Sequence, residues 1–320
     1  MEAGARTGLS DADTAGRDTG AQDMPWFEPF RPWMARSDPR ASGRIDLGLL
    51  NRFAEDRGLR TEDGLPLRFA DARTAPPGAY ERVVREHGAV PTRASGAGML
   101  HDWFNALAWL AWPRTKARLN RLQSDAIAAQ ETAQETAQET ALSRRGALRD
   151  AATILDESGV LFVCNDPALA DALRRFDWRA LFVDGRPRFL AAARVRLLGH
   201  GLGEKLLAPY KALCAHAWIV EAPAGTAIGT LDGDAFDAAA RATLDASALR
   251  ASTLSPLPLL GVPGWWPANS VPAFYDDAQV FRPGRRRGRI STGAGRTIAG
   301  CGAQAPSLEE GPDSTGQDAG

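Results

Sequence analysis

The strongest apolar pattern in the chain is MLHDWFNALAWLAW at residues 99–112. Large apolar residues recur there at the spacing of one helical face, and tryptophans widen that face until it covers most of the helix. A helix that is apolar nearly all round is predicted to lie at the centre of the fold. Pro113 suits the first turn of a following helix, in which Leu119, Leu122 and Ala126 continue the apolar spacing.

Weaker patterns define the remaining elements. Shorter helices are predicted at residues 47–57, 79–86, 144–153, 167–176, 178–183, 202–207 and 234–249, the last capped by Asp234. Strands are predicted at residues 65–69, 189–198 and 215–220, and residues 154–164 resemble a hairpin with the turn DESG. Because helices and strands mix without strict βαβ alternation, the pattern predicts an α+β fold: helix-rich, with a small mixed sheet and an irregular aromatic C-terminal arm.

Composition sets the domain boundaries. Residues 1–23 contain one large apolar residue besides Met1, and residues 285–320 are rich in Gly, Ser, Thr and Asp, so neither segment can bury enough surface to offset the entropy of ordering. We predict disordered tails around a single globular domain at residues 24–284, and expect translation to start at Met24. The QETA repeat at residues 130–141 has no apolar face, so it is predicted to be a solvated insertion.

Charge and cysteine content narrow the functional classes. The formal net charge is −1, so binding of nucleic acid or an anionic membrane is not favoured, and a role for the arginine-rich tail in nucleic-acid binding is the weakest hypothesis. The three cysteines lie far apart without a CxxC pair, and no apolar stretch approaches the ~18 residues that span a bilayer. These features predict a cytoplasmic protein. No phosphate-loop, dinucleotide or zinc-finger motif occurs, so the motifs leave the cofactor unknown.

Four segments carry a family resemblance: HDWFNALAWLAWPRTKARLN at 101–120, RRGALRDAATILDESGVL at 144–161, GHGLGEKLLAPY at 199–210, and LLGVPGWWPAN with FYDDAQVFRP near the end. They resemble uncharacterised bacterial proteins, mainly proteobacterial, grouped as the domain of unknown function 3025. That family has no assigned reaction, cofactor or catalytic residue, so the resemblance implies no activity.

His200 and Glu204 are the first candidate site residues. They lie four apart at a predicted helix start, so their side chains share a face, and Lys205 lies beside them. Between two glycines at a strand-to-helix junction, His200 is a candidate general base or metal ligand that Glu204 would orient. The alternative is a structural histidine bonded to a first-turn carboxylate.

His101 and Asn105 form a polar stripe on the apolar helix, next to Asp102. Buried polar groups need partners, so the stripe either belongs to an internal hydrogen-bond network or faces a cavity where His101 meets His200.

Arg114 and Lys116 lie in the first turn of the helix that starts at Pro113, where free N–H groups would suit an anion. The alternative is ordinary solvated or ion-paired side chains. Asp156 and Glu157 are either paired catalytic carboxylates or residues of the hairpin turn, and DESG between two apolar runs favours the turn.

The leading hypothesis is a hydrolase-like enzyme for a small anionic substrate. His200 would act as base with Glu204 orienting it, and His101 would be a second acid, base or ligand. Asp102 is a further catalytic candidate, and the substrate would contact Asn105, Arg114, Lys116 and Lys205. Metal dependence stays open. The rival is a non-catalytic protein-interaction module whose aromatic arm docks an unidentified partner through Trp265 and Trp266. A core-stapling role is the ordinary alternative for these tryptophans.

Overall fold

The computed structural model describes residues 20–135 and 139–284. A four-stranded mixed sheet has the strand order β4-β3-β5-β6. β3 (Gly159–Cys164) is parallel to β5 (Cys214–Glu221) and antiparallel to β4 (Ala193–Leu197), and β6 (Ser255–Pro258) is antiparallel to β5. Every residue of β3 is buried, because this strand has a partner on each side and helices pack against it.

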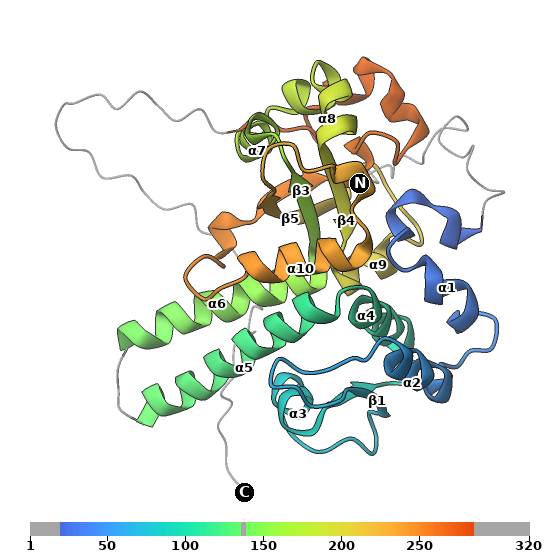
Figure 1. The fold of residues 1–320 in the computed structure, drawn as a ribbon, viewed down its shortest axis with the longest axis vertical. Coiled ribbons are helices and arrows are strands. Elements are labelled where there is room, and N and C mark those ends of the chain that lie inside the picture. Colours follow the sequence, from blue (N-terminus) through green and yellow to red (C-terminus); the bar gives the residue numbers. More distant parts are fainter. Residues whose placement is uncertain (1–19, 136–138, 285–320) are drawn as a thin grey trace, which may run out of the picture. The chain divides into compact units, whose positions relative to one another are not determined.

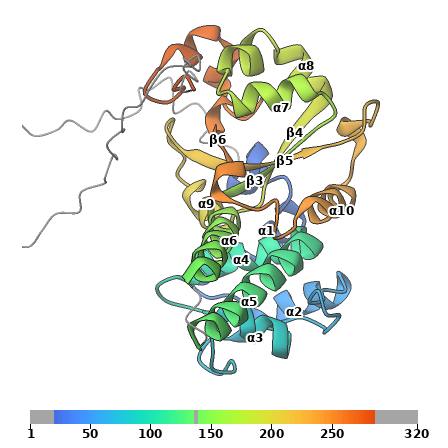
Figure 2. The ribbon, with the colours of Figure 1, turned by 90° about the vertical axis from the view of Figure 1, so that its left-hand side faces the viewer.

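Two groups of helices pack around this sheet. α7 (Pro167–Arg174) and α8 (Arg186–Ala192) lie above it, and α10 (Gly233–Thr243) lies near its lower end (Figures 1 and 2). Below it lie α4 (Met99–Ala111), α5 (Pro113–Glu135), α6 (Glu139–Ser158) and α9 (His200–Lys205). α4 is buried along almost its whole length, as its nearly all-apolar sequence predicts.

The N-terminal part builds a smaller unit against α4. β1 (Arg68–Asp71) and β2 (Ala89–Thr92) form a parallel pair, and α3 (Tyr80–His87) provides the crossover between them. α3 ends at Gly88, whose φ of 58° is the left-handed conformation that glycine adopts without strain. α1 (Arg31–Ser37) and α2 (Leu47–Asp56) complete this part.

The predicted α+β class, with a helix-rich chain and a small mixed sheet, is confirmed. The predicted hairpin at residues 154–164 is wrong, because residues 154–158 are the last turn of α6 and β3 pairs with the later strands β4 and β5. The strand predicted at 189–198 begins only at Ala193, because α8 occupies the preceding residues. The cap of α10 is Asp232, which accepts from the Ala235 amide, rather than Asp234.

The expectations for the C-terminal arm, the two tails and the QETA repeat can be compared with the structure only in part. The predicted irregular arm contributes the edge strand β6. The predicted tail at 285–320, most of that at 1–23, and residues 136–138 of the repeat lie outside the described residues. Within residues 20–135 and 139–284, no helix combines the length and apolar composition that crossing a bilayer requires.

Candidate functional site

The register of β3 against β4 determines which side chains meet at the candidate site. Val160 at the start of β3 pairs with Leu197 at the end of β4, so the residues just before β3 and just after β4 share one end of the sheet. Glu157 therefore lies in the last turn of α6 beside His200, the first residue of α9. The chain must be glycine at position 199, since a Cβ there would lie 2.5 Å from the backbone nitrogen of residue 159.

His101 reaches the same place from α4. α9 packs against α4 at Gly203, where a Cβ would lie 2.7 Å from Cδ1 of Phe104. This close approach brings the two imidazoles, 99 positions apart in the sequence, to an Nε2–Nε2 distance of 3.1 Å. The structure thus brings together the two histidines singled out from the sequence.

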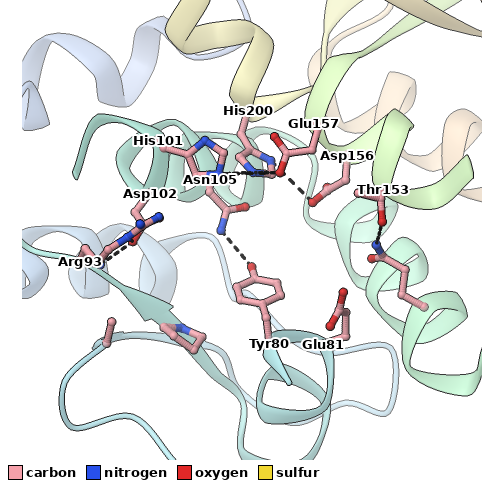
Figure 3. A pocket seen from close by; sticks show the side chains of 13 residues that line it. Tyr80, Glu81, Arg93, His101, Asp102, Asn105, Thr153, Asp156, Glu157 and His200 are labelled. Atoms are coloured by element: carbon pink, nitrogen blue, oxygen red, sulfur yellow. Dashed lines mark hydrogen bonds and ion pairs between the residues drawn. The ribbon is translucent and has the colours of Figure 1, made fainter. Parts of the chain in front are cut away.

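Glu157 completes a cluster of three possible metal ligands. Its Oε1 lies 3.3 Å from Nε2 of His200 and 3.8 Å from Nε2 of His101. The hydrogen bond with His200 lowers the pKa of Glu157, although partial burial opposes this shift. His200 is 5 % exposed, whereas His101 and Glu157 are only partly buried, so the cluster has an inner wall and an open side. Figure 3 shows the three side chains converging.

The other ring nitrogen of each histidine faces a further carboxylate. Asp156 Oδ2 lies 3.6 Å from Nδ1 of His200, and Glu204 Oε2 lies 3.7 Å from Nδ1 of His101. Glu204 is therefore beside His101 and not beside His200, which corrects the orienting role expected for it. The ring of His200 turns inward to Glu157, whereas Glu204 lies one turn later at the partly exposed rim.

Lys116 neutralises the inner carboxylate. Its ammonium group lies 2.5 Å from Oδ1 of Asp156 and donates to Oδ1 of Asn105 at 2.9 Å, with the side chain 2 % exposed. Burial alone would raise the pKa of Asp156, but the positive charges of Lys116 and His200 outweigh it and lower that pKa. Lys116 is thus committed to an internal ion pair.

The anion site expected at the start of α5 is filled by the chain itself. The amides of Arg114 and Thr115 each donate to the carboxylate of Asp237 at 2.8 Å. The guanidinium of Arg114 donates to the backbone oxygen of Asp234, away from the histidines. Arg114 therefore does not join Lys116 in holding a ligand. A helix start that looks vacant in the sequence has its partner 123 residues further along.

Two further sequence candidates lie outside the cluster. Asp102 is buried at the cavity edge, where Arg93 binds it through the backbone amide at 2.6 Å and through its guanidinium. Lys205 is exposed and does not line the cavity. Asp102 is thus ion-paired with Arg93 and anchors the loop between β2 and α4.

The family comparison covers this whole site. Residues 67–285 match the family described as a protein of unknown function, DUF3025. The chain belongs to the DUF3025 family. The matched DUF3025 region contains His101, Glu157 and His200 with both outer carboxylates. None of the curated proteins and none of the solved structures compared with the chain matches it.

In this DUF3025 protein, the cluster of His101, His200 and Glu157 opens onto a cavity of about 370 Å³. The cavity lies between α3, the end of β2 and the helices α4, α6 and α9 (Figure 3). Its charged lining consists of four carboxylates and one guanidinium, from Glu81, Asp102, Asp156, Glu157 and Arg93. Arg93 pairs with Asp102 and Lys116 with Asp156, so the carboxylates of Glu81 and Glu157 are in excess over the lysine and arginine side chains at this cavity. That excess suits a divalent cation.

Sequence reasoning missed Asp156, Glu157 and Tyr80. One available signal was electrostatic: once residues 144–158 are seen as one helix, two adjacent carboxylates occupy its last turn, where the helix dipole favours cations. Such a placement needs compensation from outside the helix, which here comes from Lys116 and His200.

The tryptophan pair of the C-terminal arm has mainly a packing role in this DUF3025 chain. Trp265 is 9 % exposed, and its ring centroid lies 6.3 Å from that of Trp26. Trp266 is partly buried against the same core. This packing does not favour the docking alternative, because the larger part of the proposed docking surface is already covered.

Proposed function

We propose that this DUF3025 protein is a metal-dependent hydrolase whose divalent ion, best matched by Zn²⁺, binds Nε2 of His101, Nε2 of His200 and a carboxylate oxygen of Glu157. The observation that carries the proposal is the mutual spacing of these three atoms, which is 3.1, 3.3 and 3.8 Å. Two imidazoles and one carboxylate are a common ligand set for catalytic zinc.

The spacing matches tetrahedral coordination. Zinc binds imidazole nitrogen at about 2.0–2.1 Å and carboxylate oxygen at about 2.0–2.2 Å, so two ligands of a tetrahedral ion lie roughly 3.3–3.5 Å apart. The three observed separations bracket this range. An ion at the centre would therefore need only small side-chain movements.

The outer carboxylates support the same assignment. In zinc sites, a ligating histidine usually donates its other N–H to a carboxylate or carbonyl, which fixes the tautomer and directs the free lone pair at the metal. Asp156 and Glu204 lie beside the Nδ1 atoms of His200 and His101, respectively. Nδ1 of His200 is buried without a hydrogen bond, and Asp156, 3.6 Å away, is an acceptor that a small movement would bring within reach.

Three protein ligands favour catalysis over a structural role. Structural zinc sites are closed by four protein ligands, whereas catalytic sites leave one position for water or substrate. Here the open side of the cluster faces the cavity. A bound divalent ion lowers the pKa of its water ligand to near neutrality and so supplies a hydroxide nucleophile for hydrolysis.

Metal content and affinity test the metal site. Full-length wild-type chain, stripped with a chelator and titrated with Zn²⁺, should bind about one equivalent, as measured by calorimetry and elemental analysis. His101→Ala, His200→Ala and Glu157→Gln should each weaken binding, and His87→Ala, an exposed histidine outside the cluster, should not. Equal zinc affinity in wild type and all three ligand variants would overturn the site.

Turnover tests the reaction class. The zinc-loaded chain should hydrolyse members of a panel of small acyl esters and anilides, and Glu157→Gln should abolish the zinc-dependent part. Wild type that binds zinc at the cluster but shows no zinc-dependent turnover of any panel member would contradict the hydrolase assignment and leave the metal site standing.

A further inference from the structure

Tyr80 lies on the floor of the cavity, across from the histidines. It is the first residue of α3, and its hydroxyl points toward Asn105 and the cluster beyond it (Figure 3). The hydroxyl has two hydrogen-bond partners, Nδ2 of Asn105 at 2.9 Å and Nε1 of Trp109 at 3.0 Å. Nothing in the metal site requires this arrangement.

The chemistry of the partners fixes the direction of each hydrogen bond. An ammonium group only donates, so the Asn105 atom that faces Lys116 must be the carbonyl oxygen. The amide nitrogen of Asn105 therefore faces Tyr80 and donates to it. The indole N–H of Trp109 also only donates. The Tyr80 oxygen thus accepts two hydrogen bonds.

The proton of Tyr80 is left without an acceptor. A phenol oxygen that accepts twice still carries one O–H hydrogen. Among the described residues, none accepts a hydrogen bond from Tyr80. Burial, together with the negative charge of Asp156, raises the pKa of Tyr80, so the proton stays on the oxygen at neutral pH. A buried donor without an acceptor is costly, and one on a cavity wall is placed to meet a ligand.

We infer that Tyr80 donates this hydrogen bond to the acyl oxygen of an uncharged carboxylic acid derivative, an amide or ester, held in the cavity. The inference rests on the proposed function and names its substrate class. During hydrolysis, water adds to the acyl carbon and negative charge develops on the acyl oxygen, where an O–H donor stabilises it. The C–N or C–O bond then breaks, and the leaving group takes the proton released by the attacking water.

The charge balance favours an uncharged substrate over the anion expected from the sequence. Arg93 and Lys116 are each already ion-paired, with Asp102 and Asp156. A divalent ion would cancel the remaining two negative charges of the cavity. The loaded cavity would then have no excess positive charge to attract an anion.

Two probes separate the contribution of Tyr80 from that of the metal. Acetohydroxamic acid offers oxygen acceptors and a metal ligand together, whereas imidazole is a metal ligand without an oxygen. Both would be titrated against the zinc-loaded full-length chain. Tyr80→Phe should weaken the binding of acetohydroxamic acid about 10-fold, which is the effect expected for one lost hydrogen bond. The affinity for imidazole should stay the same. The control Tyr210→Phe removes the same hydroxyl group from an exposed tyrosine outside the cavity, so both probes should bind as in wild type.

A second replacement keeps the test decisive if Tyr80→Phe destabilises the fold. A ring-fluorinated tyrosine at position 80 keeps both internal hydrogen bonds and makes the O–H a stronger donor. It should therefore raise the affinity for acetohydroxamic acid and leave the affinity for imidazole unchanged. Unchanged acetohydroxamic acid affinity with intact zinc binding would overturn the role of Tyr80 alone. Phosphate binding more tightly than acetohydroxamic acid would overturn the uncharged class. Absence of zinc binding in wild type would overturn the proposed function and this inference together.

Discussion

Removing the Lys116 ammonium should strongly destabilise the protein. In Lys116→Met the side chain keeps a similar length, but Asp156 loses the cation 2.5 Å from its Oδ1. The side chains of Lys116 and Asp156 are 2 % and 14 % exposed, so water cannot replace the lost partner. Breaking one half of a buried ion pair typically costs ~3–5 kcal/mol, because the remaining charge stays desolvated.

This cost is large relative to the total stability of a domain, which is ~5–15 kcal/mol. Urea unfolding of the chelator-treated chain should therefore show a much lower midpoint with an unchanged dependence on urea concentration. Asp156→Asn, which leaves the Lys116 ammonium without its carboxylate partner, should lower the free energy of unfolding by a similar amount. The double variant should cost clearly less than the two single variants added together, since it leaves neither charge alone.

Additivity would refute the reasoning. If the free energy of unfolding of the double variant falls by the sum of the two single effects within ~0.5 kcal/mol, the two groups do not interact as the structure shows. A loss of unfolding free energy below ~1 kcal/mol in Lys116→Met would mean that the pair behaves like a solvent-screened surface ion pair.

Asp156→Asn should also weaken zinc binding about 10–100-fold, because Asp156 lies beside Nδ1 of a proposed ligand.

Three further predictions follow from other contacts. Gly203→Ala should move α9 away from Phe104, cost ~1–3 kcal/mol in urea unfolding and weaken zinc binding; wild-type values for both would contradict the close approach. Asp237→Ala should cost at least ~1–2 kcal/mol in urea unfolding, because two amides at the start of α5 lose their acceptor; a loss under ~0.5 kcal/mol would count against this capping role. Burial lowers the pKa of His216, so its contribution to stability is complete above the unfolded-state pKa of ~6.5 and is lost as pH falls through the lower folded-state pKa. His216→Asn should therefore lose less stability than wild type between pH 7 and pH 5 in paired thermal scans, and equal losses would argue against it.

Local patterns predicted α2, α3, α4 and α7 closely because each of these helices carries its own periodic apolar face, whereas α1 was not predicted and part of α8 was predicted as a strand. α4 begins after Gly98 and ends just before Pro113, which begins α5, and both of these signals are visible in the sequence. The hairpin prediction failed at Gly159, which looks like a turn residue. In the structure this glycine starts β3 against the backbone oxygen of Leu155, where no side chain fits. The same residue type serves both purposes, and only the long-range strand pairing distinguishes them.

That pairing also explains which site residues the sequence could not provide. His101 and His200 stand out as polar residues in apolar or glycine-rich surroundings. Glu157 joins them only because the β3–β4 register places residues before Val160 beside residues after Leu197. The anion site failed for the same reason, since Asp237 comes from α10, a separate part of the chain. Local sequence identifies side chains with unusual surroundings, but tertiary pairing supplies their partners.

The local rules that this protein breaks are concentrated around one cavity. Two carboxylates end a helix against its dipole, a lysine is almost fully buried, and two imidazole nitrogens that could share at most one proton face each other at 3.1 Å. Each feature is unfavourable by itself, and natural sequences retain such conflicts mainly where function requires them. A divalent ion between the imidazoles and Glu157 would turn the opposed nitrogens into ligands and balance the excess negative charge. Because these unfavourable features all lie around one cavity, together they are a stronger reason to expect a metal here than any single distance.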